Sequence, residues 1–240
     1  MVKNVVLEDA SRYNRKEYKY LVPNRIIDIL IPDILMYMDY DDFSKDGYYP
    51  IYSIYFDTID LQTFSNKVAG LQHRRKFRVR SYHPNVKPNE PVFLEIKEKN
   101  TNRIFKRRVG LSLEETLSLT KHKNNVSPNN QVTDEWRYEL IKNNLKPCLL
   151  NYYQRLAFIS RTYPGLRITI DRDISYLYTQ ELDFNLPTKK VSWAHNKSVI
   201  EVKYDSFIPL FVLDMIRRYG LTAEPVSKYA DSIISGYSLH

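Results

Sequence analysis

Several stretches of the sequence alternate charged and apolar residues, and the charged residues are of kinds that bind phosphate. In the segment 199–204, Glu201 and Lys203 alternate with apolar side chains. Side chains of a β-strand point alternately to its two faces, so this segment would form a strand with one charged face. Arg can bind a phosphate through two hydrogen bonds, and Lys binds it as a point charge. The same alternation recurs in the segments 15–21, 74–80, 92–99 and 166–173.

The positive charge of the chain is concentrated on these faces. The chain has 36 Lys and Arg against 28 Asp and Glu, a net charge of +8. One charged, solvated face is common in antiparallel sheets, so a single strand of this kind indicates little. Together, however, the faces carry 11 basic and 4 acidic residues, a net charge of +7, which favours an anionic ligand. These residues are Lys19, Lys76, Arg78, Arg80, Lys97, Lys106, Arg108, Arg155, Arg167, Lys203, Lys228, Glu17, Glu95, Asp171 and Glu201.

The strand faces also indicate an architecture. If the apolar faces lie beneath helices, the charged faces point inward, which predicts a closed antiparallel β-barrel with a charged lumen. Like charges that face one another repel unless the lumen is wet, contains interspersed acids or holds a polyanion. The interspersed acids do not suit direct contact with an anion. They suit a divalent cation that bridges to the phosphates.

The remaining sequence predicts one α+β domain over residues 1–240, with about eight strands and flanking helices. Ser112 followed by Glu115 predicts a capping box at a helix start, and Pro209 with Gly220 predicts the two ends of another helix. The polar segment 121–133 is expected to be a loop. The expected strands are 15–22, 51–57, 74–82, 92–99, 103–109, 152–160, 166–173 and 198–204, and the other expected helices are 24–37, 134–144 and one that follows Ser227.

Composition argues against several classes of protein. Cys148 is the single cysteine, so no disulfide can form within the chain. No segment resembles a signal peptide or a membrane span, and a cytoplasmic protein is expected. Glycine-rich phosphate loops are absent, and the five His lack metal-ligand spacing. The basic run 74–80 would face acids of other strands, whereas nucleic-acid grooves are more uniformly basic, so no nucleic-acid partner is expected.

Nine short motifs, in order along the chain, resemble the triphosphate tunnel metalloenzymes, a CYTH-like superfamily. Within that superfamily they are most similar to the VTC domain, the polyphosphate polymerase module of the vacuolar transporter chaperone complex. The motifs are RKEYKY (15–20), SIYFDT (53–58), RRKFRVRSY (74–82), FLEIKEK (93–99), KRR (106–108), YQRLAF (153–158), LRITID (166–171), VIEVKY (199–204) and SKY (227–229).

The resemblance implies roles for several charged residues of these motifs. Glu201 would hold Mn²⁺ or Mg²⁺, with help from Glu17 or Glu95. Related tunnel enzymes often begin with Glu-x-Glu-x-Lys, but here Arg15 replaces the first acid, which favours the polymerase branch over a two-metal hydrolase. The residues expected to contact phosphate are Lys19, Arg78, Arg80, Lys97, Lys106, Arg155, Arg167, Lys203 and Lys228, and Arg108 joins them because it shares the charged face of Lys106.

The expected function is therefore a metal-dependent polyphosphate polymerase. It would transfer the terminal phosphoryl group of a nucleoside triphosphate such as ATP to a growing inorganic polyphosphate chain. One alternative is a triphosphatase or polyphosphatase, in which the same residues transfer the group to water. Another is a non-catalytic module that binds polyphosphate. Glu201 argues against this alternative, because it is an acid in the position of a metal ligand.

Overall fold

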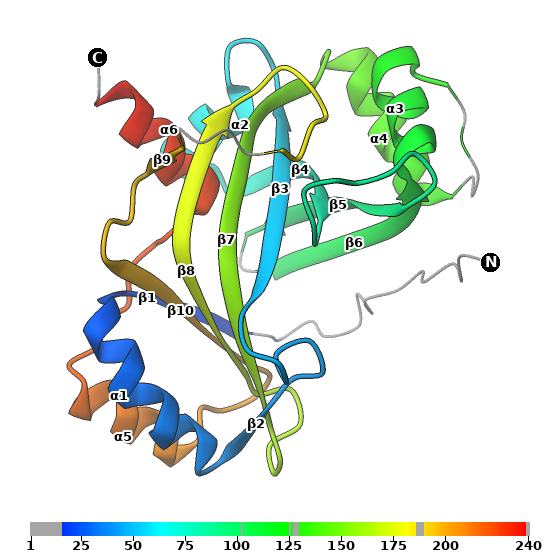
Figure 1. Cartoon of the computed structure of the whole chain (residues 1–240). Coiled ribbons are helices and arrows are strands. Elements are labelled where there is room, and N and C mark those ends of the chain that lie inside the picture. The colour runs from blue at the N-terminus through cyan, green and yellow to red at the C-terminus, as the bar shows by residue number, and fades with distance from the viewer. Residues whose placement is uncertain (1–15, 102, 125, 127–129, 186–189, 239–240) are drawn as a thin grey trace. The chain divides into compact units, whose positions relative to one another are not determined.

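The computed structural model describes residues 16–101, 103–124, 126, 130–185 and 190–238 (Figure 1). Its helices are α1 Asn24–Leu35, α2 Gln62–Val68, α3 Leu113–His122, α4 Gln131–Lys142, α5 Leu210–Arg218 and α6 Lys228–Tyr237. Its strands are β1 Lys16–Pro23, β2 Met38–Tyr40, β3 Tyr49–Asp57, β4 His73–Ser81, β5 Pro91–Asn100, β6 Arg103–Ser112, β7 Lys146–Ser160, β8 Arg167–Tyr178, β9 Val191–Ser192 and β10 Lys197–Tyr204.

The strands pair in the order β1-β10-β8-β7-β3-β4-β5-β6, with β2 also on β7 and β9 also on β8. The pairings with a defined register are antiparallel. The prediction of an antiparallel α+β fold is thus confirmed. Within the described part of the chain, however, β1 and β6 end this order, so hydrogen bonds do not close the strands into a ring. The closed barrel is not confirmed.

The chain forms two compact units, which are described separately. In its described part, unit 1 contains residues 51–101, 103–124, 126, 130–151, 176–185 and 190–191, and unit 2 contains residues 16–50, 152–175 and 192–238. Strands β7 and β8 each contribute residues to both units. The assignment of residues 1–240 to a single domain stays a prediction.

In unit 1, strands β3 to β6 are consecutive neighbours, and helices α3 and α4 lie beside β5 and β6 (Figure 1). Trp136 of α4 is fully buried, and its ring meets the rings of Phe56 and Phe77 edge to face, at centroid distances of 5.1 and 5.2 Å. Phe77 belongs to the apolar face of β4, so α4 covers that face. Lys76, Arg78 and Arg80 consequently point to the opposite face, as alternation predicts, whereas Arg75 shares the face of Phe77.

In unit 2, helices α1 and α5 cover the apolar face of β1, β10 and β8 (Figure 1). Leu30 and Ile34 of α1 and Met215 of α5 pack with Ile168 and Ile200 in one buried cluster. Pro32 lies inside α1. Burial of these side chains leaves the charged face of the same strands free for a ligand or another element.

Helix ends follow local sequence signals, some of which the sequence analysis missed. The predicted capping box is confirmed, since Ser112 Oγ accepts from the N–H of Glu115 and the Glu115 carboxylate accepts from the N–H of Ser112. Helix α4 starts earlier than predicted because the Asn130 side chain caps it by accepting from two backbone N–H groups. The segment expected as a loop, 121–133, therefore contributes residues to a helix at each end.

The short helix α2 was not predicted. The Asp57 carboxylate accepts hydrogen bonds from the N–H groups of Thr63 and Phe64 at 2.8 and 3.1 Å. This contact ties the first turn of α2 to the end of β3. None of the described helices has the length and apolar character needed to span a bilayer.

Candidate functional site: one charged cluster in each unit

Unit 1 contains a cluster of basic side chains around one buried acid, here called the Glu95 cluster. The register of β4, β5 and β6 places Arg78, Glu95 and Arg108 side by side, and Lys97 beside Lys106. Residues opposite one another in antiparallel strands point to the same face. These side chains therefore share the face opposite to the one that α4 covers.

Glu95 is the centre of this cluster and is 1% exposed. Arg78 Nε lies 2.6 Å from its Oε2, while Arg80 Nη1, Lys106 Nζ and Arg108 Nε lie 3.6, 3.6 and 3.8 Å from its Oε1. Burial alone would raise the pKa of the Glu95 carboxyl, but these four cations outweigh burial and hold the pKa well below its ordinary value. Glu95 is thus ionised and fixes the directions of the basic side chains around it.

Aromatic side chains support two of the arginines. Arg78 donates a hydrogen bond from Nη1 to the Tyr55 hydroxyl at 3.1 Å. The Arg108 guanidinium lies 3.6 Å from the centroid of the Phe93 ring and donates to the Tyr82 hydroxyl at 3.2 Å. Stacking on a ring and a fixed hydrogen bond reduce the freedom of a guanidinium, which prepares it for a phosphate.

Unit 2 contains a second cluster, here called the Glu201 cluster, which is richer in acids. The register of β1, β10 and β8 places Lys19, Glu201 and Thr169 in one row. The adjacent row consists of Glu17, Lys203 and Arg167. Helix α6 begins with Lys228, whose ammonium group reaches Asp171 and Glu201.

Ion pairs join the members of the Glu201 cluster. Glu201 Oε2 lies 3.0 Å from Lys203 Nζ, and its Oε1 lies 3.4 Å from Lys19 Nζ and 3.6 Å from Lys228 Nζ. The two oxygens of Asp171 accept from Arg155 Nε and Nη2 at 2.6 and 2.7 Å. Asp171 is fully buried and Glu201 is 6% exposed. Every one of these charges is therefore held in place by a partner of opposite sign.

The electrostatics of this cluster favour the charged forms of Glu201, Asp171 and Lys19. Burial raises the pKa of Glu201, but Lys203, Lys19 and Lys228 lower it further, so the pKa lies well below its ordinary value. Burial likewise raises the pKa of Asp171, and Arg155 and Lys228 reverse that effect. Burial lowers the pKa of Lys19, yet the attraction of the nearby carboxylates raises it overall.

A profile of the VTC domain matches residues 14–237. The chain belongs to the VTC domain family. This match confirms the resemblance to the VTC domain that the nine motifs indicated. No curated protein sequence matches this VTC domain.

A solved structure with little sequence identity shares the fold of this VTC domain. A Bacillus halodurans protein provisionally assigned as an adenylate cyclase superposes with a TM-score of 0.56 at 15% identity, over 89% of this chain and 95% of that chain. A Vibrio parahaemolyticus protein with the same provisional assignment gives 0.46 at 11% identity, over 91% and 97% of the two chains. A Pyrococcus horikoshii protein gives 0.46 at 13% identity, over 92% and 99%.

Within each unit, the structure of the VTC domain brings predicted residues together in one cluster. The Glu95 cluster holds the unit 1 residues Lys76, Arg78, Arg80, Glu95, Lys97, Lys106 and Arg108, six basic and one acidic. The Glu201 cluster holds the unit 2 residues Glu17, Lys19, Arg155, Arg167, Asp171, Glu201, Lys203 and Lys228, five basic and three acidic. The excess positive charge thus belongs mainly to unit 1, and the acids mainly to unit 2.

Two predicted residues have surroundings that the sequence did not indicate. Arg167 lies at the edge of the Glu201 cluster, where its Nη2 donates to Asp41 at 2.6 Å. Glu17 lies next to Lys19, with its Oε1 3.2 Å from Lys19 Nζ. Arg15, whose replacement of an acid favoured the polymerase branch, lies outside the described residues.

Sequence reasoning also missed three residues of the VTC domain as site candidates. Asp171 appeared only as a member of a charged face, yet it binds both Arg155 and Lys228. Tyr153 places its ring 4.7 Å from Lys228 Nζ and 5.3 Å from the Arg155 guanidinium. Thr169 carries no charge and gave no signal, although alternation puts it on the face of Asp171.

The carboxylates of the Glu201 cluster fit a divalent cation only if a bound ligand supplies further oxygen atoms to the same cation. Within the described residues, no three His, Cys, Asp or Glu side chains gather as a metal site. Mg²⁺ is usually bound through one or two carboxylates together with substrate phosphates. Glu201 and Asp171 are two buried carboxylates of this kind. Phosphates would also draw the lysine ammonium groups away from Glu201, which would leave its oxygens available to a cation.

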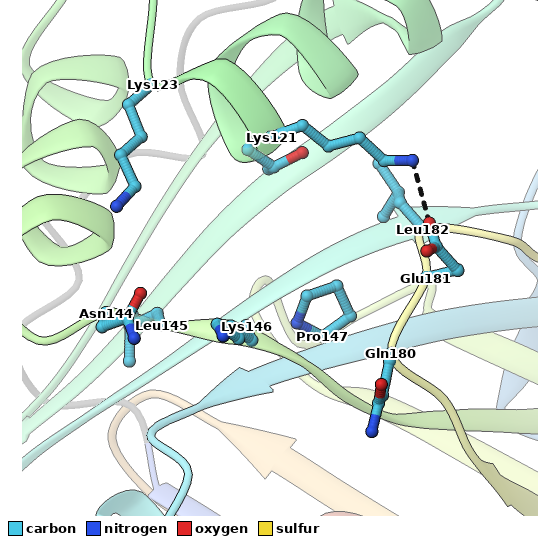
Figure 2. Close-up of a pocket in the computed structure, with 10 residues that line it drawn as sticks. Lys121, Lys123, Asn144, Leu145, Lys146, Pro147, Gln180, Glu181 and Leu182 are labelled. Carbon is cyan, nitrogen blue, oxygen red and sulfur yellow. Dashed lines mark ion pairs between the residues drawn. The ribbon is translucent and has the colours of Figure 1, made fainter.

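A hollow on the surface of unit 1 belongs to neither cluster (Figure 2). It has a cavity volume of about 370 Å³ and is lined by the end of α3, the start of β7 and the segment 180–182. Figure 2 shows the ion pair between Lys121 and Glu181 at its rim, at 2.9 Å. Because Lys121 and Lys146 are exposed and Lys121 is already paired, this hollow is a weaker phosphate site than the Glu95 cluster.

Proposed function

We propose that this VTC domain is a metal-dependent polyphosphate polymerase that uses ATP or another nucleoside triphosphate. The single observation that supports the proposal most is the pair of charged clusters in a chain of this family. In each, buried acids hold basic side chains on one face of the strands. Such fixed cations suit phosphoryl transfer, in which catalysis consists mostly of positioning and of stabilising charge on phosphate oxygens.

The Glu95 cluster would bind phosphates of the chain or of the nucleotide. Its six basic side chains face one acid, so it has the surplus positive charge that a polyanion requires. Glu95 itself is surrounded by four cations, which would repel a divalent ion. We therefore expect Glu95 to orient Arg78 and Arg80 rather than to hold a metal.

The Glu201 cluster would act on the phosphoryl group that is transferred. Glu201, with Asp171 beside it, would hold Mn²⁺ or Mg²⁺, and the ion would neutralise charge on the phosphates. Lys203, Lys19 and Lys228 would bind equatorial oxygens of that group. An oxygen at the end of the growing chain forms the new P–O bond, the bond to the bridging oxygen of the nucleotide breaks, and the nucleoside diphosphate leaves without consuming water.

The alternatives differ in what accepts the phosphoryl group. A triphosphatase or polyphosphatase would use the same clusters with water as the acceptor, and a binding module would show no turnover. The test is incubation of the purified protein with ATP and Mn²⁺, with a sample in EDTA as the control. The products are separated on a polyphosphate gel and assayed for free phosphate. Metal-dependent long chains are expected, whereas free phosphate alone would indicate the hydrolase and no turnover the binding module.

Ligand binding can be tested without turnover. Tripolyphosphate in EDTA should raise the thermal melting temperature, because a ligand that binds only the folded state stabilises it. The shift should become smaller as salt rises, since exposed charges are screened. An unchanged melting temperature with millimolar tripolyphosphate at low salt would contradict the proposal that the clusters bind a phosphate chain.

A further inference from the structure

Thr169 is a buried polar residue that the ion pairs of the Glu201 cluster leave unused. It is 1% exposed, and among the described residues its hydroxyl has no hydrogen-bond partner. A hydroxyl removed from water without a partner destabilises a folded protein, so most buried hydroxyls are paired. Thr169 is therefore a place where the protein by itself leaves a hydrogen bond unmade.

The strand register shows where this hydroxyl lies. Thr169 is the antiparallel partner of Glu201, so the two side chains point to the same face of β8 and β10. Along β8, alternation puts Arg167 and Asp171 on that face as well. Thr169 is thus surrounded by the residues that Glu201 and Asp171 hold in place, and it lies away from the apolar face that α1 and α5 cover.

The charges around Thr169 indicate the chemistry of its missing partner. Basic side chains outnumber acids by five to three in this cluster, so an entering group is favoured if it is anionic. Both oxygens of Glu201 and both of Asp171 already have cationic partners. A hydroxyl donates one hydrogen bond without adding charge, and the β-branched Thr side chain is stiff about its first torsion.

We propose that the Thr169 hydroxyl donates a hydrogen bond to a phosphoryl oxygen of the bound phosphate chain. It would fix the orientation of the phosphoryl group next to Glu201, where lysine ammonium groups alone allow many arrangements. This inference rests on the proposed function, because it needs a phosphate chain in the Glu201 cluster. It adds a neutral phosphate-binding residue that neither the charge pattern nor the nine motifs single out.

The test compares Thr169→Val with Thr169→Ser. Valine keeps the shape but removes the hydroxyl, and serine keeps the hydroxyl but removes a methyl group. Affinity for tripolyphosphate is measured by calorimetry in EDTA and again with Mg²⁺, and the melting temperature of each free protein is recorded. The valine variant should bind about tenfold more weakly than wild type, the loss expected for a hydrogen bond to a charged group. Its melting temperature should be equal or higher, because an unpaired buried hydroxyl is gone.

Thr116→Val is the matched control. Thr116 is also fully buried, but its hydroxyl donates to the Ser112 carbonyl at 2.9 Å within unit 1. Its replacement should lower the melting temperature and leave tripolyphosphate affinity unchanged. If Thr169→Val does not fold, Thr169→Ala replaces it, since alanine and serine at this position differ only in the hydroxyl.

The outcomes separate this inference from the proposed function. Wild-type affinity in the valine variant would overturn the inference alone, and so would an equal loss in the valine and serine variants. A difference that appears only with Mg²⁺ would mean that the hydroxyl acts through the cation, which overturns the phosphate contact. If wild type does not bind tripolyphosphate under either condition, the proposed function fails and the role of Thr169 fails with it.

Discussion

Lys228 Nζ lies 2.6 Å from Asp171 Oδ2, so a buried ion pair joins the first residue of α6 to β8. Arg155 binds the same carboxylate. Asp171 is therefore the common partner of two cations that come from different elements of unit 2. Helix α6 owes its position to this acid as well as to the Ser227 side chain, which caps its start.

We expect Asp171→Asn to lower stability strongly. The substitution leaves Arg155 and Lys228 without their shared carboxylate, and loss of one partner of a buried ion pair typically costs about 3–5 kcal/mol. The free energy of unfolding in urea is the measurement. Asp39→Asn is the control, because Asp39 pairs with Arg161 at 2.6 Å in an exposed position and should change stability little. Equal effects of the two substitutions would contradict the central place of Asp171.

Glu201→Gln should separate metal binding from phosphate binding. Three lysines lose their anionic partner, so the free protein should melt at a lower temperature. Those lysines are then available to phosphate, so tripolyphosphate affinity in EDTA should be maintained or increase. Turnover should collapse, because a hard cation loses its carboxylate ligand. Full activity with an unchanged Mn²⁺ requirement would move the metal assignment to Glu17.

Arg78→Ala and Arg80→Ala should weaken tripolyphosphate binding by about 1.5–3 kcal/mol each, the scale of a hydrogen bond to a charged group. Arg75 lies on the other face of β4 and donates to the buried Glu139 of α4. Arg75→Ala should therefore leave the affinity unchanged. It should lower stability by about 1–3 kcal/mol, because Glu139 loses its cationic partner. Calorimetry measures the tripolyphosphate affinity of the three variants, and urea unfolding measures their stability. An equal loss of affinity in all three would show that the register of β4 is incorrect.

Stability should fall in acid. The cations around Glu95, Asp171 and Glu201 hold the pKa of each carboxyl below its value in the unfolded chain, despite burial. Their contribution is complete above the unfolded pKa values, near 4, and is lost as the pH falls through the lower folded values. We expect the free energy of unfolding to decrease below about pH 4, by about 1.4 kcal/mol per pH unit for each proton taken up.

Glu95→Gln provides the check on this acid dependence. The variant should be less stable near pH 7, where the carboxylate is ionised. Its stability should also depend less on pH below about pH 4, because one linked proton is gone. Urea unfolding of both proteins from pH 2 to pH 8 measures the two slopes. Parallel curves would show that Glu95 has the same pKa in the folded and unfolded chain.

The sequence predicts those parts of the site that depend on local periodicity. Glu201 and Lys203 share a face because side chains of a strand alternate, and the register confirms this. Contacts between elements that are distant in the sequence produce no local sequence pattern. Nothing near Arg75 indicates that Glu139 of α4 is its partner, and nothing near Lys228 indicates Asp171. Closure of a barrel likewise depends on strand pairing at long range, which alternation does not specify.

The pairing of β1 with β10 has a consequence for how the protein is made. Lys16 pairs with Tyr204 and Pro23 with Lys197, so β1 leaves the ribosome long before its partner. At synthesis rates of about 5–20 residues per second, the wait is on the order of 10–40 s. The neighbouring strands β4, β5 and β6 can pair during that time. Until β10 emerges, β1 exposes unpaired backbone groups, and a chaperone that binds extended segments would find it there.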